Sequence, residues 1–213
     1  MVEIAAILLA AGASSRFKAA AGGDASKLVA PLAGKPLVRY AAEAALASPA
    51  RPILVITGCD RGAVEAALDG LDLSFAHNAG YAQGLASSLQ TGIAALPARV
   101  AGVLVLLGDM PAVTPALIDR LIAAFGERPD ALAAAPTLDG RRGNPVLLSR
   151  VLFPAIAGLT GDEGARKLLD RAGPGQMIEV DVSGVGSVLD VDTPQALAEV
   201  RQAFEKQGDK RSR

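Results

Sequence analysis

The alternation of short apolar runs with segments of helical periodicity is the feature that most limits how this chain can fold. Short runs rich in Val, Ile and Leu, bounded by glycine, proline or polar residues, are typical of buried strands. Between them, apolar residues recur at the three- and four-residue spacing of amphipathic helices. Strands that alternate with helices build βαβ units around a mainly parallel sheet. We therefore predict an α/β fold, a Rossmann-like three-layer domain with helices on both faces of the sheet.

The expected elements can be assigned to residue ranges. Strands are predicted at Ile4–Ala10, Ile53–Thr57, Leu73–Ala76, Val103–Leu107, Leu132–Ala135, Val146–Leu148, Met177–Val182 and Val188–Val191. Helices are predicted at Pro36–Ala47, Arg61–Leu68, Leu85–Leu96, Pro115–Phe125 and Gly164–Ala172, and from Pro194 onward. Thr114-Pro115 and Thr193-Pro194 each combine a threonine N-cap with proline at the first helical position. With no internal repeat or long linker, one domain is expected over residues 1–205, followed by a basic, disordered tail over residues 206–213.

Composition argues against several classes of function. One cysteine and one histidine, His77, leave no disulfide and no zinc site built from several such ligands. A formal net charge of −1 argues against a nucleic-acid binder that relies on bulk electrostatics. No apolar run reaches the ~18 residues that cross a bilayer, and the first residues lack the basic region of a signal peptide. A cytoplasmic enzyme that uses carboxylates, lysine, arginine, backbone amides and a hard metal ion is expected.

The loop after the first predicted strand has the composition of a phosphate-binding turn. In open α/β sheets ligands bind beyond the carboxyl ends of the strands, where Leu9-Ala10-Ala11-Gly12-Ala13-Ser14-Ser15-Arg16 would lie. Small residues let successive N–H groups approach phosphate oxygens, and Arg16 and Lys27 add positive charge. Neither the Walker pattern nor G-x-G-x-x-G is present. An ordinary strand-to-helix turn is the alternative interpretation.

Three aspartates are candidates for a metal site. Asp109 follows the run Val103–Leu107, and Asp190 and Asp192 lie two residues apart before Thr193-Pro194. Residues i and i+2 of a strand point the same way, and Mg²⁺ takes one or two carboxylates plus substrate phosphates. We predict that Asp109, with Asp190 or Asp192, holds Mg²⁺. The alternative is that these residues only cap the helices that follow.

Two further groups of residues suit ligand recognition without being diagnostic. Asn78, Gly84 and Ser88 lie in a glycine-punctuated segment that suits a base or ribose, although an ordinary capped loop would have the same composition. Asn144-Pro145 and the segment Gly161-Asp162-Glu163-Gly164-Ala165-Arg166 have the glycine content of loops that shape a second pocket.

Taken in order, these motifs resemble the molybdenum cofactor cytidylyltransferases, a branch of the NTP-transferase (MobA-like) superfamily. The resemblance is carried by the loop from Leu9 to Arg16 with Lys27-Leu28, by Asn78 to Ser88, Gly108-Asp109-Met110-Pro111 and Asn144-Pro145-Val146, and by Gly161 to Arg166 and Asp190 to Pro194. It spans nearly the whole chain. Each motif alone is weak, but their ordered combination is specific.

The resemblance implies transfer of CMP from CTP to molybdopterin, which forms molybdopterin cytosine dinucleotide and releases pyrophosphate with Mg²⁺ as cofactor. It implies that the nucleotide is bound by Leu9, Ala10, Ala11, Gly12, Arg16, Lys27, Asn78, Gly84, Ser88 and Asp109. Of these, Arg16, Lys27 and Asp109 are the implied catalytic residues. The pterin is implied to contact Asn144, Pro145, Asp162 and Arg166. Related guanylyltransferases carry Ala-Gly-Gly where this chain has Ala-Ala-Gly, so Ala11 favours CTP over GTP. A molybdoenzyme or its chaperone is the implied protein partner.

The chain departs from the family in one place. The family joins the arginine and lysine by a short link, whereas here Ala19–Ser26 intervene before Lys27. This leaves open whether Lys18 or Lys27 reaches the phosphates. Lys27 is favoured, because Lys27-Leu28 and the following Pro31–Pro36 resemble the family's continuation.

Several alternatives stay open from sequence. They are a guanylyltransferase, a transferase for sugar or isoprenoid phosphates, and a non-catalytic accessory protein that binds the cofactor. A Rossmann oxidoreductase is disfavoured by the missing dinucleotide fingerprint.

Overall fold

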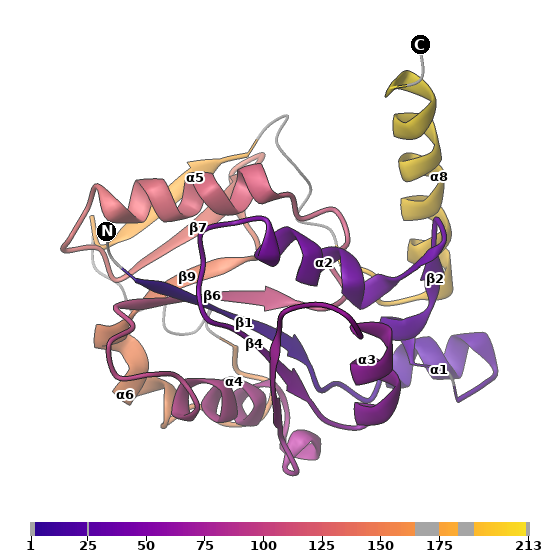
Figure 1. The fold of residues 1–213 in the computed structure, drawn as a ribbon, viewed down its shortest axis with the longest axis horizontal. Helices are drawn as coiled ribbons and strands as arrows, with labels where there is room; N and C mark the ends of the chain where they lie inside the picture. Colours follow the sequence, from indigo (N-terminus) through magenta and orange to yellow (C-terminus); the bar gives the residue numbers. More distant parts are fainter. Residues whose placement is uncertain (1–2, 25, 165–174, 183–189, 212–213) are drawn as a thin grey trace.

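A mainly parallel sheet forms the centre of the molecule (Figure 1). The computed structural model describes residues 3–24, 26–164, 175–182 and 190–211. Within them the strand order is β10-β7-β9-β6-β1-β4-β5, with the short β8 beside β7. β9 runs antiparallel to both of its neighbours, and β8 is antiparallel to β7. The strands are β1 (Ile4–Ala10), β4 (Ile53–Thr57), β5 (Ser74–His77), β6 (Gly102–Leu107), β7 (Ala133–Leu138), β8 (Arg141–Arg142), β9 (Val146–Ser149) and β10 (Met177–Asp181).

Alternate residues of the central strand β1 pack into two separate hydrophobic layers. Ala6, Leu8 and Ala10 pack into one layer, while Ile7 and Leu9 pack into the other. All seven residues of β1 are buried, which explains why its sequence is continuously apolar rather than alternating. A strand covered on both sides requires helices on both faces of the sheet.

Helices cover both faces, as predicted. They are α1 (Ser15–Ala21), α2 (Leu37–Leu46), α3 (Arg61–Ala67), α4 (Leu85–Ala94), α5 (Pro115–Gly126), α6 (Phe153–Ile156) and α8 (Pro194–Arg211), with short 3₁₀ turns at Lys27–Val29, Tyr81–Gln83 and Arg150–Leu152. Side chains of α2, α3 and α5 fill one hydrophobic layer, and those of α4 and α6 fill the other. The expected α/β three-layer arrangement is confirmed.

Both predicted threonine caps are present. The Thr114 hydroxyl accepts the N–H of Leu117 at 3.2 Å, and the Thr193 hydroxyl accepts the N–H of Ala196 at 3.1 Å. Each threonine satisfies an N–H that has no partner within its own helix. Because Thr114 and Thr193 do the capping, the neighbouring aspartates remain available for other contacts.

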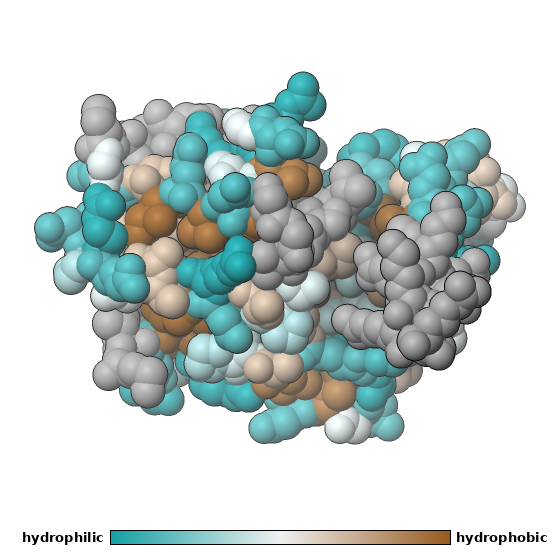
Figure 2. Space-filling model, turned by 90° about the horizontal axis from the view of Figure 1, so that it is seen from above, coloured by the Kyte–Doolittle hydropathy of each residue, from teal (hydrophilic) through white to brown (hydrophobic). Residues whose placement is uncertain are grey.

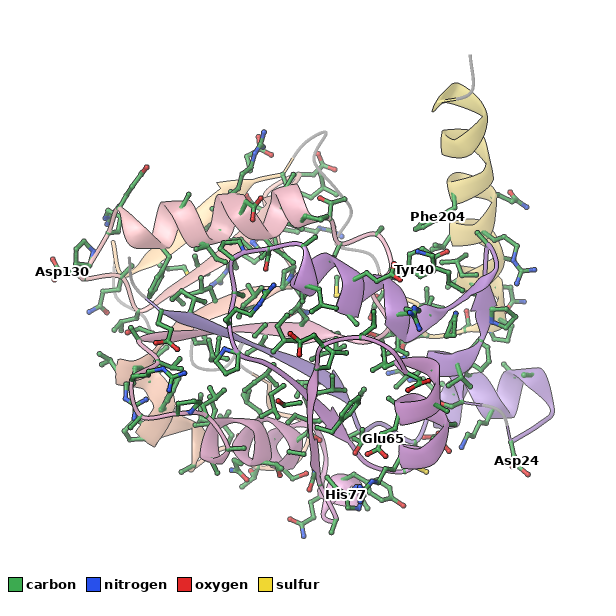
Figure 3. The ribbon with its side chains drawn as sticks, in the orientation of Figure 1. Asp24, Tyr40, Glu65, His77, Asp130 and Phe204 are labelled. Atoms are coloured by element: carbon green, nitrogen blue, oxygen red, sulfur yellow. The ribbon has the colours of Figure 1, made fainter. Side chains whose placement is uncertain are left out.

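A third, smaller hydrophobic cluster lies outside the sheet and joins an N-terminal segment of the chain to a C-terminal one. A two-stranded hairpin, β2 (Pro31–Leu32) with β3 (Lys35–Pro36), contributes Leu32 to this cluster, while Val191 and Leu197 come from the C-terminal part. Helix α8 stands away from the body beyond this cluster (Figure 1). Tyr40 of α2 meets Phe204 of α8 edge to face, with ring centroids 5.2 Å apart (Figure 3).

The structure differs from the sequence expectations in three places. Helix α1 was not predicted, and it takes up Ala19–Ala21 of the inserted segment. Asp190 and Val191 are not in a strand, while residues 188 and 189 and most of the predicted helix over residues 164–172 lie outside the described residues. The predicted disordered tail begins inside α8, which continues through Arg211, because Lys, Gln and Arg have good helix propensity.

The face covered by α5 and α2 has a mixed surface. Figure 2 shows hydrophilic residues interspersed with apolar ones on this side of the molecule. In the part of the chain that the structure describes, no helix combines the length and apolarity needed to span a membrane.

Candidate active site

The carboxyl ends of the central strands bring the predicted motifs to one edge of the sheet. Leu9 of β1 is in register with Leu107 of β6, and Ala10 is in register with Thr57 of β4. A cavity of about 640 Å³ opens beyond these strand ends, within the size range of small-molecule sites. It is lined by Leu9, Ala11 to Phe17, Lys27, Leu28, Tyr81, Ala82, Gly84, Leu85, Ser88, Leu107, Asp109, Asp162, Asp190 and Asp192.

The loop after β1 is tied to the segment that carries Lys27. Ser14 has a left-handed backbone conformation, with φ 56° and ψ 30°, directly before α1. Its buried hydroxyl accepts the backbone N–H of Lys27 at 3.3 Å and lies 3.4 Å from the hydroxyl of Ser26. These contacts hold the start of the Lys27 segment against the loop, despite the residues inserted between them.

The end of β4 supports the same loop from the other side. The backbone N–H of Cys59 donates to the carbonyl oxygen of Ala11 at 3.2 Å. A Cβ atom at Gly58 would lie only 2.5 Å from that carbonyl oxygen, so glycine allows the close approach. The backbone of the loop is therefore fixed next to β4.

Four charged side chains form a chain of ion pairs along the cavity wall. The ammonium group of Lys27 donates to Oδ2 of Asp109 at 2.6 Å and to Oδ1 of Asp192 at 2.7 Å. The other oxygen of Asp192 accepts from the guanidinium group of Arg16. The Lys27 and Asp109 side chains are only 14% and 15% exposed, whereas Arg16 is 79% exposed. The two inner residues are thus shielded from water and the outer arginine is not.

The charges in this network stabilise one another. Burial opposes the charged ammonium, but the Asp109 and Asp192 carboxylates outweigh burial and raise the pKa of Lys27 above its usual 10.5. The hydrogen bond from Lys27 lowers the pKa of Asp192 below its usual 3.8 against the effect of burial, and Arg16 adds to the lowering. At neutral pH the lysine and Asp192 are therefore both ionised.

The segment that carries Asp190 and Asp192 is held in place by its middle residue. The backbone N–H of Val191 donates to the carbonyl oxygen of Asp109 at 2.9 Å. The Val191 side chain is fully buried in the third hydrophobic cluster. Asp190 and Asp192, on either side of it, both line the cavity. Of these two, Asp192 is the one that shares a cation with Asp109.

The acidic part of the site fits a divalent cation. Oδ1 of Asp109 is buried, and within the described residues it has no hydrogen-bond partner. Asp109 and Asp192 contact the same ammonium group, so one cation can bridge their carboxylates. Across the described ranges, no three Asp, Glu, His or Cys side chains gather as a metal site. Two carboxylates suit Mg²⁺, which completes its shell with water and substrate phosphates.

The opposite wall is built by the segment from Asn78 to Ser88. The amide nitrogen of Asn78 donates to the hydroxyls of Ser87 and Ser88 at 2.8 and 3.0 Å. The amide oxygen of Asn78 accepts the N–H of Gly80 at 2.9 Å. Asn78 is 5% exposed and does not line the cavity, but its hydrogen bonds hold Ser88, which does line it.

Glycine at position 84 lets residues 161–162 pack directly against the start of α4. Its φ is 98°, and a Cβ atom there would lie 2.4 Å from the carbonyl carbon and oxygen of Gly161. The carboxylate of Asp162 accepts the N–H of Leu85, the first residue of α4, at 3.3 Å. Asp162 therefore caps this helix as well as lining the cavity.

A second cavity of about 200 Å³ adjoins the first and shares part of its wall. It is lined by Leu9, Leu85, Leu89, Val105, Leu107, Asn144, Asp162 and Gly164. Its surface is mainly aliphatic, with Asn144 and Asp162 as its polar groups. Pro145 is buried beside it, and Arg166 lies outside the described residues.

The structure brings most of the predicted nucleotide-site residues together. Those that line the large cavity are Leu9, Ala11, Gly12, Arg16, Lys27, Gly84, Ser88 and Asp109. Ala10 and Asn78 are buried behind its walls. Sequence reasoning did not single out Tyr81 or Leu85 as lining residues, or Ser14 as the residue that anchors Lys27. Tyr81 lies within the segment from Asn78 to Ser88 that carries the family resemblance, whereas no sequence signal marked the Ser14–Lys27 contact.

Comparisons with known proteins identify the family of this chain. A family model described as the MobA-like NTP transferase domain matches residues 6–177. The chain is 31% identical over 195 residues to the nicotine blue oxidoreductase of Paenarthrobacter nicotinovorans, covering 89% of this chain and 92% of the relative. It is 28% identical over 208 residues to the purine catabolism protein PucB of Bacillus subtilis, covering 93% and 96%.

A solved structure shares the fold over nearly its whole length. The protein Rv0371c of Mycobacterium tuberculosis, in its complex with manganese, superposes with a TM-score of 0.75 at 27% sequence identity, covering 94% of this chain and 99% of that chain. The family model covers well over half of the sequence and includes the loop after β1, Lys27 and Asp109. The family predicted from the ordered motifs is confirmed: the chain belongs to the MobA-like NTP transferases.

Proposed function

We propose that this nucleotidyltransferase transfers CMP from CTP to molybdopterin, with Mg²⁺ as cofactor, and releases pyrophosphate. The observation that carries the proposal is the set of Arg16, Lys27, Asp109 and Asp192 on the wall of one cavity. Two cations and two carboxylates suit a triphosphate with its metal ion. The adjoining cavity offers room for an acceptor next to the nucleotide.

The proposed reaction is an in-line displacement. A phosphate oxygen of the acceptor forms a bond to the α-phosphorus of the nucleotide, while the bond from that phosphorus to the bridging oxygen breaks. The electron pair leaves with pyrophosphate. The nucleophile is already an anion, so no general base is required. This suits a chain whose one histidine, His77, is at the end of β5 and does not line the cavity (Figure 3).

The residues of the chain then position the substrates and neutralise charge. Lys27 and Arg16 offset negative charge on the triphosphate, and the backbone of the loop from Gly12 to Ser15 lines the same space. Bound Mg²⁺, held by Asp109 with Asp192 or Asp190, would neutralise further phosphate charge. The solved complex of the related M. tuberculosis protein with manganese supports the proposal that a divalent cation takes part.

Two features of the walls support the choice of substrates. Ala11 lines the cavity at the position where related guanylyltransferases carry glycine, and we expect its extra methyl group to favour a pyrimidine over a purine. The second cavity combines aliphatic side chains with the polar groups of Asn144 and Asp162. A planar heterocycle with N–H groups, such as a pterin, suits these walls.

The test is pyrophosphate release with each common nucleoside triphosphate, Mg²⁺ and molybdopterin, together with identification of the product by mass. We expect release with CTP and a molybdopterin cytosine dinucleotide as product. Release with GTP would identify a guanylyltransferase. Release only when a sugar or isoprenoid phosphate replaces the pterin would keep the transferase class and change the acceptor. Pterin binding without pyrophosphate release would indicate an accessory protein.

An oxidoreductase is a second candidate, because one relative carries that name. The loop after β1 lacks the G-x-G-x-x-G pattern of dinucleotide-binding folds, which favours the transferase. Oxidation of NADH or NADPH in the presence of a dye acceptor measures this activity directly. We expect no turnover above the rate without protein.

A further inference from the structure

We infer that Asp109 and Asp192 are the pair that would hold the metal ion, and that Lys27 is their internal counter-ion, which occupies both carboxylates in the ligand-free protein and releases them when nucleotide phosphates bind it. The inference rests on the proposed function in one respect: the ligands of this site are a triphosphate and a divalent cation. Beyond that function, it predicts an order of binding. The protein alone binds the cation weakly, and a bound nucleotide makes the cation site available.

The geometry of the ammonium group is the first step of the argument. One nitrogen atom contacts Oδ2 of Asp109 at 2.6 Å and Oδ1 of Asp192 at 2.7 Å. It therefore lies between the two carboxylates that a metal ion would bridge. A divalent cation placed there would meet the like charge of the ammonium at close range, in a region of reduced dielectric.

Shielding from water distinguishes Lys27 from the other cation of the site. The Lys27 side chain is 14% exposed and its two partners are 15% and 30% exposed. Arg16 also contacts Asp192, but it is 79% exposed, so solvent competes for its guanidinium group. Lys27 is accordingly the cation that controls access to the carboxylates.

The Asp109 oxygen that Lys27 does not contact cannot form a metal site by itself. Oδ1 of Asp109 is buried, and in the described part of the chain nothing donates to it. A single carboxylate oxygen is a weak ligand for a divalent cation, which prefers several oxygen donors. The cation therefore needs the oxygens that Lys27 holds, or the phosphates of a bound nucleotide.

The phosphate oxygens of a bound nucleotide can replace the two carboxylates as partners of the Lys27 ammonium group. Lys27 lines the same cavity as the loop from Gly12 to Ser15, so a phosphate bound there lies within its reach. When the ammonium turns to phosphate, both carboxylates lose their counter-ion and gain affinity for the metal. By linkage, a bound metal ion must strengthen phosphate binding by the same factor.

The test measures binding of Mn²⁺ to the ligand-free protein, from the electron paramagnetic resonance signal of free Mn²⁺. K27M removes the counter-ion, and K27Q provides a second, polar variant in case K27M does not fold. K35M is the matched control, because Lys35 pairs with Glu43 outside the cavity and its loss changes the net charge equally. We expect K27M and K27Q to bind Mn²⁺ at least about tenfold more tightly than the wild type, since removing one partner leaves buried carboxylates uncompensated. K35M should stay within about twofold of wild type, as expected of an exposed pair.

A second substitution checks where the more tightly bound Mn²⁺ lies. Adding D109N to K27M should remove the gain in Mn²⁺ affinity. The inference is overturned if K27M and K27Q bind no more tightly than K35M, if neither binds Mn²⁺, or if the gain survives D109N. Because no nucleotide or acceptor is present, these results do not depend on which substrates the enzyme uses. Absence of pyrophosphate release with every nucleotide would defeat the proposed function and leave this measurement unchanged.

Discussion

The ammonium group of Lys27 lies between the carboxylates of Asp109 and Asp192, at 2.6 and 2.7 Å from their nearest oxygens. The three residues come from the 3₁₀ turn Lys27–Val29, the turn after β6 and the segment before α8. This arrangement assigns a role to each residue, and each role can be tested by substitution.

Asp109→Asn should lower the rate of pyrophosphate release by ~10²–10³-fold, as loss of one charge-stabilising group typically does. Asparagine keeps the shape of the side chain but removes the charge that binds a metal ion. The measurement is turnover under saturating nucleotide and Mg²⁺, with circular dichroism to verify folding. A near-normal rate in a folded variant would remove Asp109 from the metal site.

Lys27→Met and Lys18→Met should differ, because only Lys27 lines the cavity. Lys18 instead lies 3.4 Å from the carboxylate of Asp60. We expect turnover to fall about 100-fold in Lys27→Met, and less than about threefold in Lys18→Met. Steady-state kinetics with each purified variant separates the two. Equal losses would mean that both lysines act on the phosphates.

Gly84→Ala should destabilise the protein, because its Cβ atom would lie 2.4 Å from the backbone of Gly161 at a φ of 98°. We expect a loss of about 2 kcal/mol in the free energy of unfolding by urea. Gly62→Ala is the control, since a Cβ atom there meets nothing within 4 Å and Gly62 lies in α3. That variant should be unchanged or slightly more stable, by up to about 1 kcal/mol. Equal stability of the two variants would contradict the packing at Gly84.

Asp192→Asn should lower stability near neutral pH and lose this effect in acid. The pKa of Asp192 is lowered in the folded protein, first by the hydrogen bond from Lys27. Its charge therefore stabilises the fold above the ordinary aspartate pKa of 3.8, and this contribution disappears as the pH falls through the lower folded value. Since the side chain is 30% exposed, the difference should not exceed about 1 kcal/mol.

Urea unfolding of the wild type and Asp192→Asn between about pH 2.5 and 7 measures this dependence. Asp69→Asn, at an exposed position, is the control. The stability difference for Asp192→Asn should be constant above about pH 5 and shrink below about pH 4. A difference that persists unchanged to the lowest pH would contradict an ion pair at Asp192.

The elements of the sheet were accessible from sequence because their pattern is local. Ile4–Ala10 is apolar throughout since both of its faces are covered, and the same pattern located β4 and β6. Helix α1 was missed because Ser15–Ala21 contains few large apolar residues, and only Phe17 of this helix is buried. The threonine caps were found because the signal and its partner are three residues apart.

The sequence alone determined which segments become strands and helices, and which motifs follow the strand ends, because periodicity and capping act between residues close along the chain. It left open the choice between Lys18 and Lys27 and between Asp190 and Asp192. Which lysine and which of these aspartates meet beside Asp109 depends on contacts between distant residues: Lys27 and Asp192 are 165 positions apart. Packing of Val191 into the third hydrophobic cluster, together with its hydrogen bond to Asp109, sets which carboxylate meets the lysine. Only the tertiary structure contains that relationship, because it arises when separate elements bury their apolar surfaces against one another.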